Sequence, residues 1–332
     1  MEDIDLSPMA GKTVLVTGAN GLIGTYLVCF LHLANLCKNL NINIIAVSKH
    51  MPSLKFGGIF DVLYKFYPLD LTSDSTDDLP RADYIIHGAT YAQPEIFMKN
   101  YSETVHLNVF STENLLRKAK KDGAKFLFLS SSEVYGSPGP DNIPTKETYS
   151  GSCSPVSVRS VYAESKRLGE TLCCAYKNYE KLDVKIARIF MTYGPGLTIH
   201  DKRVMGQFIN EALVEHKVLM LDDGSKLRTF CYVADCAVML LYVLLYGKNF
   251  VYNVGGRDCI SIKRLAEKIC SLTGSTLSIG KSKVLNEGDV MISPDIVRPD
   301  ISKITSESRL TYFMPLSDGL QRTIVWNLMQ FF

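Results

Sequence analysis

The stretch TVLVTGANGLIG, residues Thr13–Gly24, decides how the rest of the chain is read. Its first five residues are largely β-branched and apolar, which is typical of a buried parallel strand. Gly18, Gly21 and Gly24 follow, and an apolar helical segment comes next. This spacing lets the backbone approach a pyrophosphate, and the helix N-terminus offers N–H groups and a favourable dipole. A glycine turn without a ligand is the alternative, but the strand–loop–helix context favours a dinucleotide site.

Strands and helices alternate onward to about residue 190. Further buried strands are predicted at Ile42–Val47, Phe66–Leu69, within Arg81–Thr90, from Phe126, and at Val184–Ile189. Beyond Phe190 the pattern changes, although FVYNVGG (Phe250–Gly256) has the character of a strand that returns to the main sheet.

The sequence therefore predicts an α/β fold with a Rossmann-type, doubly wound parallel sheet and a smaller, interleaved α/β C-terminal substrate domain. We expect residues 11–190 to bind the cofactor, with the sheet completed by about residues 235–256. Residues 191–332 are then expected to bind the substrate.

Composition excludes several classes of protein. A net charge of +2 and 21% charged residues indicate neither a nucleic-acid binder nor a membrane-surface protein. The nine cysteines include no CxxC pair, so we expect reduced thiols rather than disulfides, and no metal site. The N-terminus lacks the features of a signal peptide, and the longest apolar run is too short to span a bilayer. We expect a soluble cytoplasmic protein whose residues 1–10 form a disordered or loosely attached leader.

The cofactor preference stays open at this stage. The second strand ends in Ser48-Lys49-His50, where dinucleotide folds that bind NAD normally place an acidic residue for the adenosine ribose. This chain has no acidic residue there, and Ser48 and Lys49 could accommodate a ribose phosphate, so NADP is the alternative. NAD is the cofactor expected from the resemblance described below. Asp70 and Leu71 are expected at the adenine edge, and a small-residue loop near the nicotinamide. The predicted cofactor-binding residues are Gly18, Asn20, Gly21, Leu22, Ile23, Gly24, Ser48, Asp70, Leu71, Ala89, Thr90, Tyr162 and Lys166.

An acid–base device lies between FLFLSSSEVYG (Phe126–Gly136) and YAESK (Tyr162–Lys166). Lys166 follows Tyr162 at the fourth position along the chain, so on a helix both side chains lie on one face. The neighbouring cation is expected to make the phenol acidic. Ser131, at the end of the preceding strand, is placed to donate to the same substrate oxygen.

Three other features have structural alternatives. His87 lies within a strand and is more consistent with a satisfied core histidine than with a catalyst. Asn108, in an amphipathic helix predicted over roughly Tyr101–Asp122, is either a polar brace behind the active site or purely structural. Residues 137–160 are rich in Pro, Gly and Ser and could fold over the substrate as a lid.

Together these motifs resemble the extended short-chain dehydrogenase/reductase family, in its nucleotide-sugar epimerase/dehydratase branch, over nearly the whole chain. The matching segments are TGANGLIG (Thr17–Gly24), SSSEVYG (Ser130–Gly136), Tyr162-x-x-x-Lys166, RIFMTYGPG (Arg188–Gly196), RTFCYVADCA (Arg228–Ala237) and RPD (Arg298–Asp300). Within that branch the segment from Glu147 to Arg167 is most similar to UDP-glucuronate decarboxylases.

The resemblance implies a role for each group. Tyr162 would take the proton from the sugar C4 hydroxyl while hydride passes to the nicotinamide, and Lys166 would lower the pKa of Tyr162. Ser131 would share the hydrogen bond to that hydroxyl, and Glu133 would handle protons at C5 and C6. A homodimer built from the helices around 101–122 and 162–179 is also implied. The implied substrate-binding residues are Ser132, Tyr162, Met191, Val204, Arg228 and Arg298, the two arginines clamping the diphosphate.

Two departures bear on the substrate. Met191 replaces an Asn that commonly contacts the sugar, and Ser132 replaces the Asp of 4,6-dehydratases. Glu133 argues against a plain C4-epimerase, with a solvated or salt-bridged carboxylate as the alternative. The leading interpretation is NAD-dependent decarboxylation of a nucleotide sugar through a 4-keto intermediate. The alternatives are a 4-epimerase, 4-dehydrogenase or 4,6-dehydratase, and, from another class, a non-catalytic nucleotide-binding regulator.

Overall fold

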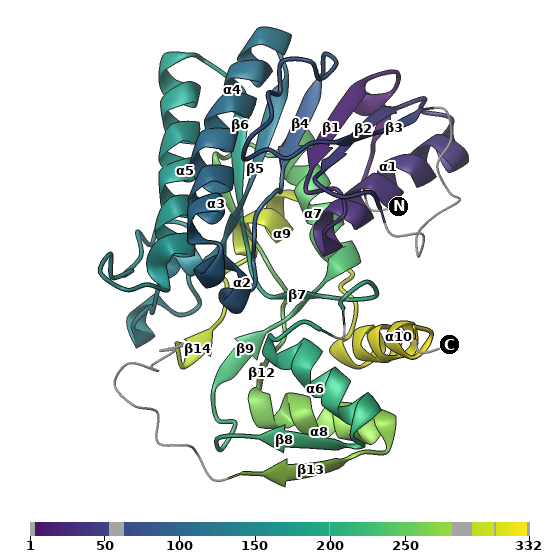
Figure 1. Ribbon diagram of the computed structural model, residues 1–332, viewed down its shortest axis with the longest axis vertical. Helices are drawn as coiled ribbons and strands as arrows, with labels where there is room; N and C mark the ends of the chain where they lie inside the picture. Colours follow the sequence, from purple (N-terminus) through teal and green to yellow (C-terminus); the bar gives the residue numbers. More distant parts are fainter. Residues whose placement is uncertain (1–3, 53–62, 199, 281–293, 309, 331–332) are drawn as a thin grey trace.

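The computed structural model describes residues 4–52, 63–198, 200–280, 294–308 and 310–330 (Figure 1). Seven parallel strands form the main sheet in the order β11-β6-β5-β4-β1-β2-β3. Their bounds are β1 Thr13–Thr17, β2 Asn43–Ser48, β3 Tyr64–Pro68, β4 Tyr84–His87, β5 Lys125–Ser131, β6 Val184–Ile189 and β11 Val251–Val254. Strand order reverses between β1 and β4, which creates a topological switch point at the carboxyl ends of the strands. The predicted doubly wound fold is confirmed.

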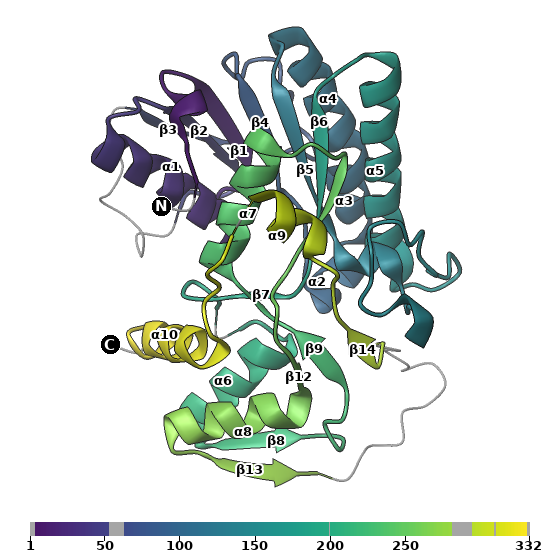
Figure 2. The ribbon, with the colours of Figure 1, turned by 180° about the vertical axis from the view of Figure 1, so that it is seen from behind.

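Helices cover both faces of this sheet. Figure 1 shows α4 (Ser111–Asp122) and α5 (Ser160–Tyr179) on one face, and Figure 2 shows α1 (Leu22–Lys38) and α7 (Val233–Tyr246) on the other. The strands have buried side chains on both faces, so Leu15 lies between Ile45 and Ile85 while Val16 faces the opposite core. Burial on both faces explains the continuous apolar runs in the sequence.

The expected leader is partly wrong. Ile4, Leu6 and Met9 are buried in the core beneath α1 and α7, and residues 7–9 form a 3₁₀ turn. The Tyr246 hydroxyl donates to the Asp5 carbonyl at 2.6 Å. Three apolar side chains in an acidic segment thus gain more from burial than they lose in chain entropy. Residues 1–3 lie outside the described residues.

The helical segment predicted over residues 101–122 is helical throughout but not uniform. It consists of α3 (Tyr101–Val105), a wider π-helical turn η3 (His106–Phe110) and α4. Such π turns are rare and frequently occur at functional sites. Here the turn carries Asn108, which is completely buried.

The C-terminal part has its own apolar core and two small sheets. Parallel β8 and β13 form one sheet, and β9 pairs with β12 and β14 in the other. A parallel pair, β7 and β10, joins this part to the main sheet. The bounds are β7 Thr192–Tyr193, α6 Val204–Val214, β8 Lys217–Met220, β9 Leu227–Thr229, β10 Cys231–Tyr232, β12 Cys259–Ser261, α8 Ile262–Thr273, β13 Thr276–Ile279, β14 Ile296–Val297, α9 Ser302–Ser308 and α10 Leu316–Leu328.

The described residues contain neither a candidate membrane span nor a candidate metal site. None of their helices is both long and apolar enough to cross a membrane, and none of their His, Cys, Asp and Glu side chains form a group of three or more able to hold a metal. All nine cysteines are free.

Replacing Gly18 should cost more stability than replacing Gly123. Both have left-handed backbones, with φ of +68° and +70°, but a Cβ on Gly18 would lie 2.7 Å from the Gly88 backbone while Gly123 faces open space. Gly123→Ala should lower the free energy of unfolding by about 1 kcal/mol through backbone strain alone. Gly18→Ala adds a backbone collision, and urea unfolding of both variants measures the difference. If both variants lost the same free energy of unfolding, the Gly18 loop would be able to move away from the Gly88 backbone at no cost.

Candidate active site

The loops that follow β1 and β4 are in contact at the switch point. The Thr17 hydroxyl accepts hydrogen bonds from the N–H groups of Gly88 (3.2 Å) and Ala89 (3.3 Å). The two backbones lie so close that a side chain on Gly18 would collide with Gly88. A Cβ on Gly24 would overlap the Gly18 carbonyl, so this glycine is needed for packing of helix against loop.

This edge of the sheet fits a dinucleotide. Gly21 caps α1, so Leu22 and Ile23 in the first turn present N–H groups at the helix end. The Thr90 hydroxyl oxygen is buried and has no hydrogen-bond partner within the described ranges. A buried hydroxyl without a partner is unfavourable, and a ligand in the crevice would supply one.

Lys49 and Asp70 form an ion pair across the ends of β2 and β3. Lys49 Nζ lies 2.6 Å from Asp70 Oδ2. The hydrogen bond from Lys49 is the largest of the effects that lower the pKa of Asp70 to about 2. Leu71 is buried, and its carbonyl accepts from the Ser111 hydroxyl at 2.7 Å. Asp70 is thus an ionised hydrogen-bond acceptor. The Leu71 carbonyl already accepts from Ser111, so the Leu71 N–H is the group available for the adenine edge.

Asn20 and Ser48 lie beside this pair. The Asn20 amide donates to the His50 carbonyl and so ties the glycine loop to the segment after β2. Ser48 ends β2 half-buried, at the place expected for the adenosine ribose.

His87 is a core residue, as the sequence indicated. One ring nitrogen lies 2.7 Å from the Thr17 hydroxyl oxygen, and the other lies 3.1 Å from the Leu107 carbonyl. Burial lowers the pKa of His87 to about 3, so the imidazole is neutral. It orients the threonine that holds the β4 loop.

Tyr162 and Ser131 lie together where α5 passes the end of β5. Both are buried, and the Ser131 hydroxyl lies near enough to the phenol to act on its pKa. Phe97, in α2 (Pro94–Lys99), stacks on the phenol ring with centroids 5.0 Å apart and planes at 12°. Burial raises the pKa of Tyr162 to about 12, with the Ser131 hydroxyl acting in the opposite direction.

The expected acidic phenol is therefore wrong for this structure. Lys166 Nζ donates to the Leu129 carbonyl at 2.7 Å and lies 4.6 Å from the centroid of the Phe128 ring. Burial lowers the pKa of Lys166 to about 7. Because desolvation disfavours both charged forms, it outweighs the attraction that sequence spacing suggested.

Asn108 supports the same helix from behind. Its side-chain nitrogen donates to the Ser165 hydroxyl at 2.9 Å, one residue before Lys166. Its side-chain oxygen is buried and without a partner among the described residues. The contact with Ser165 agrees with the brace interpretation.

Glu133 faces the same space from the turn η4 (Ser132–Tyr135). Its N–H donates to the Ser131 hydroxyl at 3.2 Å, and its carboxylate lies 3.3 Å from Arg159. The Glu133 charge acts to raise the pKa of both Tyr162 and Arg228. Glu133 thus acts on both the phenol and Arg228 of the C-terminal part, and Ser132 precedes it as the first residue of η4.

The two arginines of the expected diphosphate clamp differ in environment. Arg228 is buried on β9, where its guanidinium donates to the carbonyls of Leu227 (2.7 Å) and Asp295 (3.1 Å). Burial lowers its pKa. Arg298 is exposed just after β14, and its carbonyl accepts from the Thr145 N–H at 2.8 Å.

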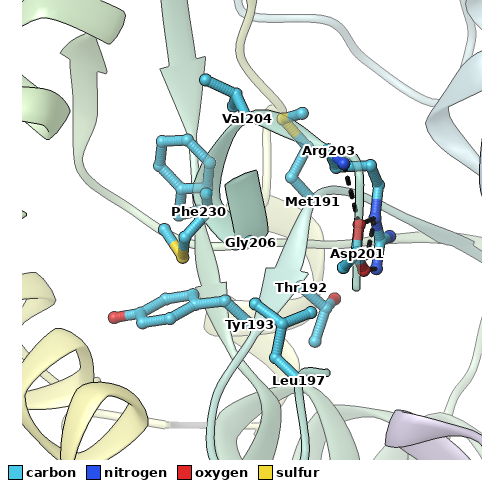
Figure 3. Close-up of a pocket in the computed structure, with 10 residues that line it drawn as sticks. Met191, Thr192, Tyr193, Leu197, Asp201, Arg203, Val204, Gly206 and Phe230 are labelled. Carbon is cyan, nitrogen blue, oxygen red and sulfur yellow. Dashed lines mark hydrogen bonds and ion pairs between the residues drawn. The ribbon is translucent and has the colours of Figure 1, made fainter. Parts of the chain in front are cut away.

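Sequence reasoning missed Arg203. It precedes α6, is held by Asp201 through paired hydrogen bonds of 3.1 Å and 2.5 Å, and acts to lower the pKa of Tyr162 (Figure 3). Its position next to Val204, in DKRVM, was the only available signal. Both residues border a small cavity whose other walls are largely apolar, namely Met191, Thr192, Tyr193, Leu197, Met205, Gly206 and Phe230, with Asp201 at its edge.

Comparison with known proteins places the chain among sugar-modifying enzymes. Residues 14–255 match the family described as the NAD dependent epimerase/dehydratase family. UDP-glucuronic acid decarboxylase 6 of Arabidopsis thaliana is 35% identical over 296 residues, covering 87% of this chain and 81% of that protein. UDP-glucuronic acid decarboxylase 1 of Xenopus tropicalis is 36% identical over 242 residues, covering 73% of this chain but just over half, 56%, of that protein.

Solved structures agree on the fold. UDP-glucuronic acid 4-epimerase from Bacillus cereus, in complex with UDP-glucuronic acid and NAD, is 25% identical with a TM-score of 0.79, covering 96% of this chain and 100% of that one. The dTDP-glucose 4,6-dehydratase from Bacillus anthracis, with NAD, is 23% identical with a TM-score of 0.78, covering 96% and 97%.

The buried ammonium of Lys166 should make stability depend on pH. Its pKa is about 7 in the folded state against the ordinary lysine value of 10.5, so between these values the unfolded chain binds more protons and stability rises with pH. Relative to Lys166→Met, the free energy of unfolding of the wild type should increase by on the order of 2 kcal/mol from pH 6 to pH 9. Lys177→Met, on the exposed face of the same helix, is the control. A pH-independent gap between wild type and Lys166→Met would contradict the buried charge.

Proposed function

The chain belongs to the NAD-dependent epimerase/dehydratase family, and from this premise we propose that it oxidises a nucleotide sugar at C4 and then decarboxylates it, as a UDP-glucuronate decarboxylase does. The observation that carries the proposal is that Ser131 and Tyr162 are buried together beside Glu133, whose N–H donates to the Ser131 hydroxyl. Family membership makes the chain an NAD-dependent enzyme rather than a non-catalytic regulator.

Bound NAD supplies the acceptor, and later the donor, of one hydride. The Gly18–Gly24 loop and the N-terminus of α1 would hold the pyrophosphate of NAD. The buried Thr90 hydroxyl would form its hydrogen bond with the bound cofactor. Lys166, directed toward the end of β5, would lie beside the ribose.

Tyr162 would act as the base in the first step. The sugar C4 hydroxyl would share a hydrogen bond with Ser131 and give its proton to the phenolate as the C4 hydride leaves, which forms a ketone. The phenol pKa of about 12 is set mainly by burial, so the phenolate needs a neighbouring positive charge to form near neutral pH. Arg203 acts in this direction on the phenol, and Lys166 lies four positions after Tyr162 on the same helix.

The second step would use Glu133. A C4 ketone turns a C6 carboxylate into a β-keto acid, so the C5–C6 bond breaks and carbon dioxide leaves with its electrons passing to the C4–C5 enolate. Glu133 would then act in the transfer of a proton to C5 of the enolate. The hydride returns to C4 and Tyr162 gives its proton back to the oxygen, which restores both groups for the next turnover.

Substrate recognition would fall to the C-terminal part. Arg228 and Arg298 would hold the diphosphate, with Arg203 as a third cation. Met191 and Val204 form an apolar wall where other family members place a polar side chain. The nine free cysteines support a reducing compartment, and we propose the cytoplasm.

Replacing the phenol hydroxyl should abolish the reaction. Tyr162→Phe should lower turnover of UDP-glucuronate by on the order of 10²–10⁴-fold, because the base for the C4 hydroxyl is lost. Tyr179→Phe, exposed on the same helix, is the matched control. Mass spectrometry of a panel of UDP-, GDP-, CDP- and dTDP-sugars identifies the product. Carbon dioxide loss from UDP-glucuronate supports decarboxylation, and an epimer, a lasting ketone or water loss would assign one of the alternatives.

We further propose a homodimer that packs α3, η3 and α5 against their copies. These elements carry the exposed apolar side chains Tyr101, Phe110, Leu168 and Tyr179. Buried apolar area of this kind favours association. Sedimentation should show that the wild type is a dimer and that Leu168→Glu is a monomer. The control variant, Leu328→Glu on α10, should sediment as a dimer like the wild type. A wild-type monomer would refute the interface.

A further inference from the structure

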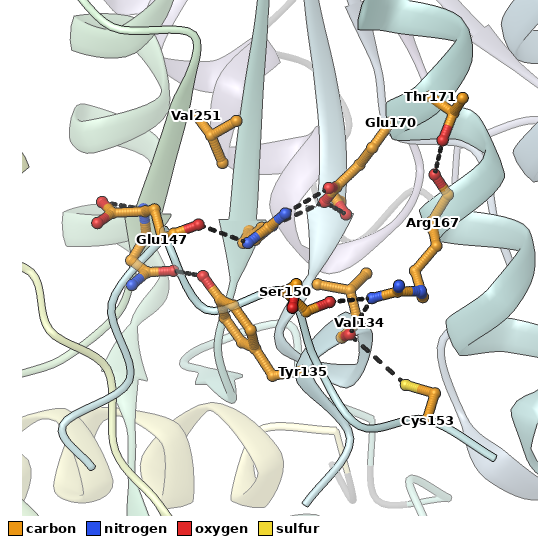
Figure 4. Close-up of polar contacts among 12 residues, drawn as sticks. Val134, Tyr135, Glu147, Ser150, Cys153, Arg167, Glu170, Thr171 and Val251 are labelled. Carbon is orange, nitrogen blue, oxygen red and sulfur yellow. Dashed lines mark hydrogen bonds and ion pairs between the residues drawn. The ribbon is translucent and has the colours of Figure 1, made fainter. Parts of the chain in front are cut away.

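The turn that carries Glu133 is held by its backbone carbonyls. The Glu133 carbonyl accepts from Cys153 Sγ at 3.3 Å, the Val134 carbonyl from Arg167 Nη1 at 3.0 Å, and the Tyr135 carbonyl from the Ser152 N–H at 3.1 Å. Residues Ser150–Cys153, here called the strap, therefore lie along η4 (Figure 4). The placement of η4 depends on the strap.

Arg167 joins the strap, η4 and α5. Its Nη1 donates to both the Val134 and the Ser150 carbonyls (Figure 4). Its Nε lies 3.5 Å from the Glu164 carboxylate. It directly follows Lys166 on the helix. One guanidinium thus connects the helix that carries Tyr162 to the turn that carries Glu133.

The strap has no room to shift. Gly151 has φ +96°, and a Cβ there would overlap the Val134 carbonyl and lie 2.7 Å from Arg167 Nη1. A Cβ on Gly136 would lie 2.8 Å from the Ser152 backbone. The register between strap and turn is therefore fixed by close backbone contact.

A buried ion pair holds the other side of η4. Arg188 donates to both carboxylate oxygens of Glu170 at 2.9 Å and 2.7 Å, and lies 4.8 Å from the centroid of the Tyr135 ring. Glu170 also accepts from Ser130 at 2.6 Å. These contacts fix the sheet end of the turn, and Arg167 fixes the strap end, nearer Glu133.

We propose that Arg167 is a positioning residue that fixes the backbone of η4, and through it Glu133, for the second half of the reaction, while Arg159 contacts the Glu133 carboxylate directly. The inference rests on the proposed function, in which Glu133 serves the step after C4 oxidation. Ser131 is anchored in the buried strand β5 and the Tyr162 ring in its stack with Phe97, and the link from Ser131 to the turn is the hydrogen bond that its hydroxyl accepts from the Glu133 N–H. Loss of Arg167 therefore disturbs the second step and spares the first.

Arg167→Met in the full chain, loaded with NAD and mixed with UDP-glucuronate, tests this selectivity. Single-turnover absorbance follows reduced nicotinamide, and mass spectrometry follows carbon dioxide loss. We expect the first hydride transfer to stay within about twofold, while formation of the final sugar, which has lost carbon dioxide and been reduced again at C4, slows on the order of 10–100-fold and reduced nicotinamide accumulates. Arg167→Lys, which keeps the charge without the fork, should recover part of the second rate. Glu164→Gln removes only the exposed ion pair and should leave both rates unchanged.

Equal slowing of both steps, or no slowing of either, would overturn the inference. So would an Arg167→Met variant that is less stable than the wild type and regains its full second rate once the fold is stabilised. Arg167→Lys keeps the test valid if Arg167→Met fails to fold. Failure of the proposed function is read separately, from the wild-type product. A wild type that only epimerises has no second step for Glu133 and also refutes the role of Arg167.

Discussion

The site depends on the contact between the loops that follow β1 and β4. A parallel sheet brings the carboxyl ends of its strands to one edge, and the reversal of strand order opens a crevice there. The Thr17 hydroxyl, oriented by neutral His87, holds the N–H groups of Gly88 and Ala89, while Gly18 admits the close approach. Polar groups inside a dry core are stable only when all are satisfied. The network therefore fixes the geometry of the crevice from which Thr90 and the α1 N-terminus face a ligand.

Burial at the end of β5 works against stability and in favour of chemistry. Lys166 keeps its ammonium under the sheet with a depressed pKa, and Tyr162 keeps its proton with a raised one. Each shift means that the charged form is disfavoured in this environment. A small change in local charge then has a large effect on which form exists, since the low dielectric screens little. The same desolvation that disfavours the lysine makes the pair responsive to a bound cofactor and substrate.

The fold could be predicted because buried parallel strands leave a local record. The predicted strand Val184–Ile189 matches β6 residue for residue, and Thr13–Thr17 matches β1. The segment 1–10 was misjudged because its burial depends on α7, more than 220 residues away, and on no local period. The pKa of Tyr162 was predicted in the wrong direction because spacing along a helix reports neighbours but not desolvation. Arg203 was missed because its importance arises only where the two parts of the chain meet.

The groups proposed for catalysis and those proposed for substrate recognition lie in different parts of the chain, so the motifs predict the type of reaction better than they predict the substrate. The groups proposed to move protons lie on β5, η4 and α5 and are fixed by the core of the large sheet. The groups proposed to recognise the sugar and diphosphate lie after β6 and on β9, where Arg228 is held by backbone carbonyls and Met191 borders an apolar cavity. On the function proposed above, a side-chain change in that cavity would alter which sugar fits without disturbing the proton-transfer geometry. Met191, where the resemblance implies Asn, would be such a change.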